Sequence, residues 1–243
     1  MTWICLALLV ALAWLYTLAA ALGGRAGWAV PWMSMPARGA WSPLDLLLAF
    51  LMWTVMMIAM MVPSAAPIVL MLARLEERHG ARAIRTGLFL AAYVAMWGAF
   101  SAAATLIQWG LHELALLRSP MGAALPWLAA AILLVAGLYQ LTPLKSACLK
   151  QCQSPISFLT RHARPGARGA LELGARYGLF CLGCCWALMA ILFAAGIMAV
   201  PWIAGLSVLV LAEKTLPGGQ WLGRIAGAGL IAYGIWIAAN SAA

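Results

Sequence analysis

Apolar runs of about 20 residues, separated by short charged segments, recur along almost the whole chain. About 20 helical residues are needed to cross the hydrocarbon core of a bilayer, which is about 30 Å thick. The chain is 66% hydrophobic and only 9% charged, with a mean hydropathy of +0.98. A water-soluble core does not need so much apolar material, and no alternation with a period of two residues supports a barrel. The sequence therefore predicts an all-α, polytopic transmembrane helical bundle.

Seven spans are expected, and six are possible. The sixth span, of about 15 residues, barely crosses a bilayer, and Pro201 near its start is also compatible with a kink in one longer helix. No hydrophilic stretch is long enough for a soluble domain, so residues 1–243 are expected to form a single integral membrane domain. The expected spans cover residues 3–22, 44–72, 84–109, 125–142, 177–197, 198–212 and 222–239.

The distribution of basic residues distinguishes between the two span counts. With seven spans, twelve of the fifteen Lys and Arg residues fall on one side, in or beside the loops 73–83, 143–176 and 213–221. Fusing the fifth and sixth spans lowers this asymmetry from twelve against three to ten against five. Because cytoplasmic loops carry an excess of Lys and Arg, seven spans with a cytoplasmic N-terminus are favoured. Topology thus explains the net charge of +9, and no basic patch indicates nucleic acid as a partner.

The cysteines gather at the cytoplasmic face in this arrangement. Cys148 and Cys152 lie in the loop before the fifth span, and Cys181, Cys184 and Cys185 lie in the first turns of that span. Disulfides are disfavoured in a reducing cytoplasm, so clustered cysteines there are more typical of metal binding or catalysis. A lone cysteine that begins the first span is better explained by packing.

Helical spacing places these thiols on shared faces. Cys148 and Cys152 are four residues apart, and Cys181 shares a face with both Cys184 and Cys185. Two such groups brought together provide either a four-thiolate site, as zinc prefers, or a two- or three-coordinate site for a softer ion such as Cu(I). The alternative is that all five act as small apolar packing residues.

The second expected span carries two rows of methionines at helical spacing, in the stretch MWTVMMIAMMVPSAAP. Met52, Met56 and Met60 form one row, and Met57 and Met61 form another beside it. Thioether is a soft, uncharged ligand that suits Cu(I) and avoids the desolvation cost of a carboxylate in lipid. Packing in irregular gaps of the core is the alternative explanation for a methionine stripe.

Two neighbouring features extend this sulfur-rich region. Pro63 removes one helical hydrogen bond, which leaves the Ala59 carbonyl free and is expected to kink the span, and Ser64 offers a hydroxyl at the bend. Met33 and Met35 form an M-x-M pair in the expected external loop. Soft ligands would then run from the outside, through the bilayer, to the cytoplasmic thiols, which is an order that suits a path for Cu(I).

No ionisable residue is expected in the middle of a span. Glu213 and Lys214 end the sixth span, and both are expected to snorkel to the membrane interface. Proton-driven transporters usually keep an ionisable relay in the membrane, and the chain has no nucleotide-binding motif either. The sequence therefore indicates no energy source for active transport.

The chain resembles a bacterial family of uncharacterised, predicted metal-binding integral membrane proteins over residues 45–230. The resemblance implies a helical membrane fold and a metal role, without a settled activity. Members of that family usually have Asn after the Gly-x-Met that closes the fifth span, where this chain has Ala199. The resemblance is carried by MWTVMMIAMMVPSAAP (52–67), YQLTPLKSACLKQCQSPISFL (139–159), GLFCLGCCWALMAILFAAGIM (178–198) and LAEKTLPGG (211–219).

The leading hypothesis is a multi-pass protein of the bacterial inner membrane that binds a soft metal, with Cu(I) favoured over Zn. It would transport the metal or deliver it to a partner membrane or metal-delivery protein, more as a non-enzymatic carrier than as an enzyme. A membrane thiol–disulfide redox protein and a structural subunit of a membrane complex are the alternatives. The candidate metal ligands are Met33, Met35, Met56, Met57, Met60, Met61, Cys148, Cys152, Cys181, Cys184 and Cys185.

Overall fold

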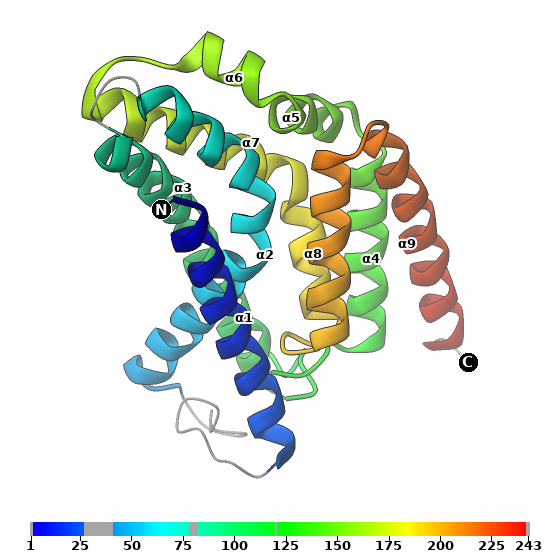
Figure 1. Cartoon of the computed structure of the whole chain (residues 1–243). Helices are drawn as coiled ribbons and strands as arrows, with labels where there is room; N and C mark the ends of the chain where they lie inside the picture. The colour runs from blue at the N-terminus through cyan, green and yellow to red at the C-terminus, as the bar shows by residue number, and fades with distance from the viewer. Residues whose placement is uncertain (1, 27–40, 78–81, 120, 242–243) are drawn as a thin grey trace.

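The computed structural model describes residues 2–26, 41–77, 82–119 and 121–241, and helices make up nearly all of this part of the chain (Figure 1). The predicted all-α class is thereby confirmed. The helices are α1 (Thr2–Ala26), α2 (Pro43–Glu77), α3 (Arg82–Glu113), α4 (Pro126–Gln140), α5 (Pro143–Gln153), α6 (Pro155–His162), α7 (Gly166–Ala195), α8 (Val200–Thr215) and α9 (Gly219–Ser241).

Proline and glycine set several of the helix ends. Proline occupies the first turn of α4, α5, α6 and α8, where its missing N–H has no helical partner to lose. After α7, Gly196 takes a φ of +103°, and the chain reverses into α8, which runs antiparallel to α7 (Figure 1). One kinked helix across both elements, the alternative weighed at Pro201, is therefore wrong.

Five helices are long and apolar enough to cross a membrane, namely α1, α2, α3, α7 and α9. A sixth span results if α4 and α5, which are bent by 64° at residues 141–142, are taken as one broken span. The 16 residues of α8 extend only about 24 Å at 1.5 Å per residue, which is less than the hydrocarbon thickness of a bilayer. The helices are thus those of a multi-pass membrane protein, while the count of seven spans and the cytoplasmic N-terminus stay predictions.

The connections between the helices lie at two opposite ends of the bundle (Figure 1). One end, which we call the inner end, carries α5, α6, the close of α2 and the turn from α8 to α9. The other end carries the loop before α4, the turn from α7 to α8, and the C-terminus of α9. The loops at the two ends are the same two groups that the distribution of Lys and Arg residues separates.

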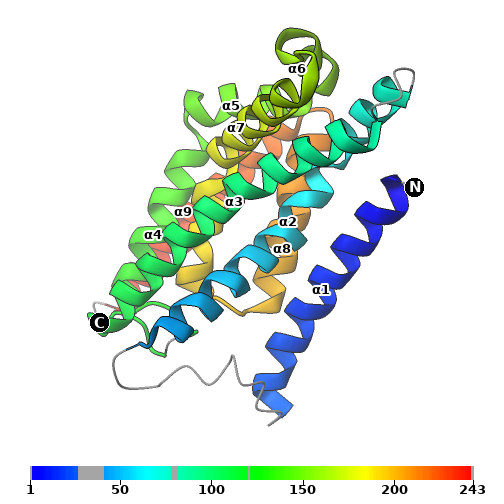
Figure 2. The same cartoon turned by 90° about the vertical axis from the view of Figure 1, so that its left-hand side faces the viewer.

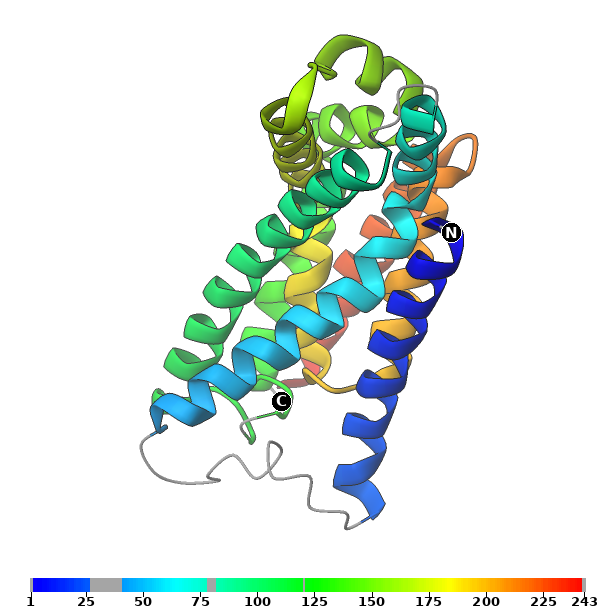
Figure 3. The same ribbon diagram turned by 60° about the vertical axis from the view of Figure 1, so that its left-hand side comes forward.

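Helix α2 packs against α1, α3, α6 and α8, whereas α7 packs against α3, α4, α5 and α8. Figure 2 shows α1 on the outside of the bundle alongside α2, and Figure 3 shows α2 crossing the bundle obliquely. The Ala59 carbonyl, freed by Pro63 four residues later, accepts a hydrogen bond of 3.0 Å from the Trp14 indole nitrogen of α1. The predicted free carbonyl is therefore the anchor point for α1.

Candidate metal centre

Four of the predicted cysteine ligands are buried at the inner end of the bundle. Cys181, Cys184 and Cys185 on α7 are at most 1% exposed, and Cys152 on α5 is 3% exposed. Cys148, also on α5, is half-buried. Helix α5 lies across the inner end because the chain bends by 64° after α4, and this bend carries its cysteines over α7. The two cysteine groups recognised in the sequence therefore lie near each other.

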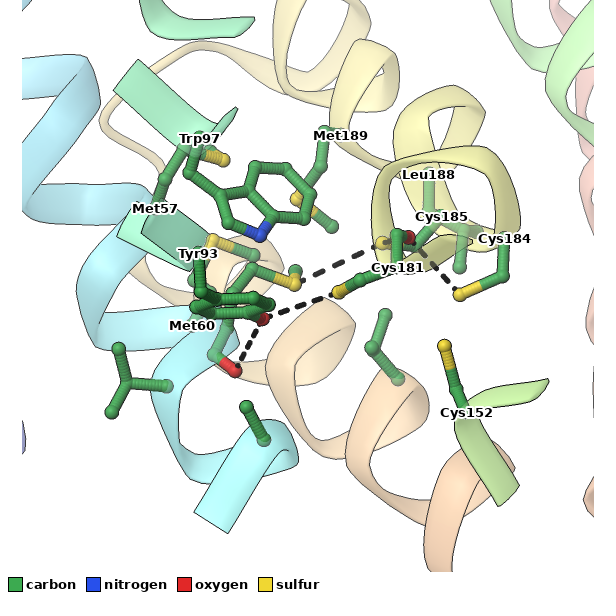
Figure 4. Close-up of a cluster of buried hydrophobic side chains, with 14 of the residues drawn as sticks. Met57, Met60, Tyr93, Trp97, Cys152, Cys181, Cys184, Cys185, Leu188 and Met189 are labelled. Carbon is green, nitrogen blue, oxygen red and sulfur yellow. Dashed lines mark hydrogen bonds between the residues drawn. The ribbon is translucent and has the colours of Figure 1, made fainter. Parts of the chain in front are cut away.

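The thiols of α7 face two different neighbours. The Cys181 carbonyl accepts hydrogen bonds from both Cys184 Sγ, at 3.1 Å, and Cys185 Sγ, at 2.9 Å. Figure 4 shows the Cys184 sulfur directed toward α5 and the Cys181 sulfur directed toward Tyr93 on the opposite side. The cluster thus divides into a part that faces α5 and a part that faces α2.

On the α2 side, a cysteine thiol meets a methionine thioether. Cys185 Sγ lies 3.8 Å from Met61 Sδ, and both residues are at most 1% exposed. Thiolate and thioether are both soft ligands, and the surroundings are apolar. This contact joins one predicted methionine row to the predicted cysteine motif.

On the α5 side, two thiols approach each other from different helices. The Cys152 sulfur of α5 points toward the Cys184 sulfur of α7 in Figure 4. Cys148 packs against the backbone of α7: a Cβ added to Gly183 would lie only 2.8 Å from Cys148 Sγ. Glycine at position 183 therefore allows α5 to approach the CLGCCW motif closely.

The sulfur atoms form pairs rather than one shared polyhedron. Among the described residues, no three His, Cys, Asp or Glu side chains are placed so that they could hold one metal ion. The four-thiolate site considered from spacing alone is thus absent from this part of the chain. Pairs of soft donors fit a low-coordinate soft ion better than the four-ligand geometry of structural zinc.

All four predicted methionine ligands of α2 are buried in the core of the bundle, and each is at most 1% exposed. Figure 4 places two of them, Met57 and Met60, beside Tyr93 and Trp97 of α3. Burial is equally the result expected if methionine only fills gaps in the core, so it does not by itself distinguish ligands from packing residues. The predicted external pair, Met33 and Met35, lies outside the described residues. The four buried methionines are Met56, Met57, Met60 and Met61.

Lys214 is part of the cluster, and the expectation that its side chain snorkels out of the bundle is wrong. Its side chain is buried, and its Nζ donates to Cys181 Sγ at 2.9 Å and to Ser64 Oγ at 2.9 Å. Helix α8 packs against both α2 and α5, so its last turn is covered by other helices. The only signal in the sequence was a lysine within the apolar stretch before LPGG.

Tyr93 of α3 completes the surroundings of Cys181. Its hydroxyl donates to the Met61 carbonyl at 3.1 Å and lies 3.2 Å from Cys181 Sγ. Tyr93 could not be identified as a site residue from the sequence, because an aromatic residue in an apolar span has no spacing signal of its own. The side chain ties the backbone of α2 to the first cysteine of α7.

Glu213 is also buried, and it forms an ion pair rather than reaching the interface. Its carboxylate lies 2.6 Å from Lys145 Nζ of α5, and Lys145 also donates to the Gln140 side chain. A Cβ added to Gly223 of α9 would lie 2.7 Å from Glu213 Oε1. This ion pair therefore connects the cysteine-bearing helix α5 to the end of α8, and Gly223 of α9 leaves room for it.

These features define a multi-pass helical protein with a buried centre of soft sulfur donors. The chain belongs to the PpoB2 family, described as copper chaperone, and the match covers residues 50–237. The predicted metal role is thereby confirmed for the family, and copper is the metal that its description gives. The matched region contains every buried cysteine and both methionine rows, and it excludes Cys5, Met33 and Met35. No curated protein and no solved structure matches the chain significantly.

Proposed function

We propose that the protein binds Cu(I) within its bundle and passes it between the methionine-lined interior and the thiols at the inner end. The contact between Cys185 Sγ and Met61 Sδ, at 3.8 Å, is the observation that carries this proposal. It supports a site in which the thiolates of Cys181 and Cys185 hold the ion and the thioether of Met61 adds a weaker bond. Membership of the copper chaperone family supports the choice of copper.

The chemistry of the site favours Cu(I) over Zn(II). The donors on the α2 side are sulfur atoms, which are soft ligands, and they come in a pair rather than as a set of four. Apolar neighbours exclude water, so an ion of low charge with few ligands is accommodated at a lower desolvation cost than a divalent ion.

The rest of the proposed path follows the sulfur atoms. Met56, Met57 and Met60 would bring Cu(I) along α2 to Met61, and Met33 with Met35 would capture it outside the membrane. On the other side, Cys184 and Cys152 would receive the ion and Cys148, which is half-buried, would release it to a partner. The protein would act in the bacterial inner membrane with its thiols on the cytoplasmic side, as a carrier rather than an enzyme.

A thiol–disulfide redox role is the second candidate, and one observation favours it. Cys152 and Cys184 come from different helices and their sulfurs point toward each other, as in a dithiol that closes to a disulfide (Figure 4). The two functions differ in their need for Met61, since a thioether takes no part in disulfide exchange.

Copper binding by matched variants tests the proposal. Protein purified in detergent would be loaded with Cu(I) under anaerobic conditions, and its affinity measured by competition with a chromogenic Cu(I) chelator. We expect one Cu(I) in the wild type, loss of binding in C181S and C185S, and an affinity at least about tenfold lower in M61L. The controls are C5S and M71L, because Cys5 is exposed and Met71 lines a groove on the outside of α2. Wild-type affinity in both C185S and M61L would overturn the proposed site.

A further inference from the structure

A buried lysine beside a candidate ligand requires a balancing negative charge. Lys214 is 5% exposed, in a core of apolar side chains and thiols. An ammonium group without a counter-ion is strongly disfavoured in such surroundings. The group that balances the positive charge of Lys214 therefore depends on what the site holds when it is filled.

Carboxylates do not provide that balance. The adjacent Glu213 pairs with Lys145, and neither of the other ion pairs found in the described parts of the chain includes Lys214. The polar contacts of Lys214 Nζ are the Ser64 hydroxyl and the Cys181 thiol, each at 2.9 Å. Of these two groups, only the thiol becomes an anion when it binds a metal ion.

We propose that Lys214 is the fixed counter-ion of a Cu(I) dithiolate formed by Cys181 and Cys185, and that its charge makes the site selective for monovalent soft ions. This inference rests on the function proposed above. When Cu(I) binds, it replaces the protons of two thiols, two copper–sulfur bonds form, and no electron is transferred. One monovalent cation and two thiolates carry a net charge of −1, which the ammonium of Lys214 neutralises.

The same charges explain why a divalent ion is disfavoured. Zn(II) with two thiolates is already neutral, so the charge of Lys214 would remain buried without a partner. Selectivity for Cu(I) over Zn(II) then has two sources. One is the softness of the sulfur ligands, and the other is the charge of a residue that does not contact the metal ion. Lys214 is thus a specificity-determining residue that acts through Cys181.

The neighbours of Lys214 hold its ammonium in position. Ser64 accepts a hydrogen bond from Nζ, and its own hydroxyl donates to the Met61 carbonyl at 2.8 Å. Tyr93 donates to that same carbonyl and lies beside the Cys181 sulfur. Lys214, Ser64 and Tyr93 thereby connect α2, beside Pro63, to the first cysteine of α7, so the charge is fixed beside the proposed ligand before a metal ion arrives.

The test compares K214M and K214R with the wild type at one fixed pH under anaerobic conditions. The probes are Cu(I) and Ag(I), both monovalent, and Zn(II), each measured by chelator competition. We expect K214M to bind Cu(I) and Ag(I) about 100-fold more weakly, with a much smaller change for Zn(II), because only the anionic complexes lose a counter-ion. K214R keeps the positive charge and should recover most of the Cu(I) affinity. K150M, which removes an exposed lysine of α5, is the matched control.

The melting temperature of K214M shows whether misfolding causes its loss of Cu(I) affinity. Removal of an unbalanced buried charge should raise the melting temperature of the metal-free protein, so K214M is expected to be folded and more heat-stable than the wild type. An unchanged ratio of Cu(I) to Zn(II) affinity in folded K214M, with Cu(I) binding still lost in C181S, would overturn the counter-ion role and leave the copper site standing. Absence of Cu(I) binding by the wild type would instead overturn the proposed function.

Discussion

Cys185 on α7 and Met61 on α2 are 124 residues apart in the chain, yet their sulfur atoms lie 3.8 Å apart inside the bundle. Two sequence patterns of different chemistry, a methionine row and a cysteine motif, therefore meet at one point. Around that point lie a buried ammonium and a tyrosine hydroxyl, each in contact with the sulfur of Cys181.

Replacement of Gly183 by alanine should disturb the contact between α5 and α7. The added Cβ would lie 2.8 Å from Cys148 Sγ, so the thiol must move, at a cost of about 1–3 kcal/mol in stability. Unfolding of the purified variant, followed by circular dichroism, measures this cost. Gly98→Ala on α3 is the control, because its Cβ would meet nothing within 4 Å. Equal stability of the two variants would contradict the close approach of α5.

Loss of the buried carboxylate should be far more harmful than loss of an exposed one. Glu213→Gln leaves Lys145 buried without its counter-charge, and we expect a loss of about 3–5 kcal/mol in the free energy of unfolding. Glu172→Gln removes an exposed pair with Arg164 and should cost about 0–1 kcal/mol. Denaturant titration of both proteins gives the comparison. Similar midpoints for the two variants would mean that the Lys145–Glu213 pair does not hold α5 in place.

A methyl group added to α9 at position 223 should destabilise the protein by disturbing the Lys145–Glu213 ion pair. The Cβ of Gly223→Ala would lie 2.7 Å from Glu213 Oε1 and 3.1 Å from Lys145 Nζ, so the pair must shift, and we expect a loss of about 1–3 kcal/mol. Gly229→Ala, six residues further along α9, faces open space and is the matched control. In the Gly223→Ala, Glu213→Gln double variant the two costs should not add, because both changes act on one contact. Full additivity would show that the glycine acts elsewhere.

The side of the membrane on which the thiols lie is tested by labelling. A variant that keeps only Cys148 should react with a membrane-impermeant thiol reagent in inside-out vesicles and stay unlabelled in intact cells, since the charge pattern places α5 in the cytoplasm. A variant without cysteines is the control for background labelling. Labelling of Cys148 from outside would reverse the orientation and favour the redox function.

Much of this arrangement could be predicted because it depends on local spacing and hydropathy. The apolar runs predicted the long helices. Cys181, Cys184 and Cys185 were expected in the first turns of a span that begins at residue 177, but they lie near the middle of α7, because that helix begins eleven residues earlier, at Gly166. The proline at position 63 predicted a free carbonyl, although not that Trp14 would bind it.

The environment of Glu213 and Lys214 could not be predicted in the same way. Neighbouring residues on a helix point in different directions, so one meets Lys145, 68 residues away, and the other meets Cys181, 33 residues away. Both contacts depend on the bend that lays α5 across the inner end and on the reversal at Gly196. Tertiary packing thus decides whether a charged helix end reaches the interface or a buried site, and hydropathy alone favours the interface.

X-ray absorption at the copper K-edge would identify the ligands of the copper ion in the Cu(I)-loaded protein. We expect an environment of sulfur only, with two short copper–thiolate bonds and a longer bond that disappears in M61L while the short bonds remain. A spectrum dominated by nitrogen or oxygen neighbours, or one that is the same in the wild type, M61L and C185S, would contradict a copper site between α2 and α7.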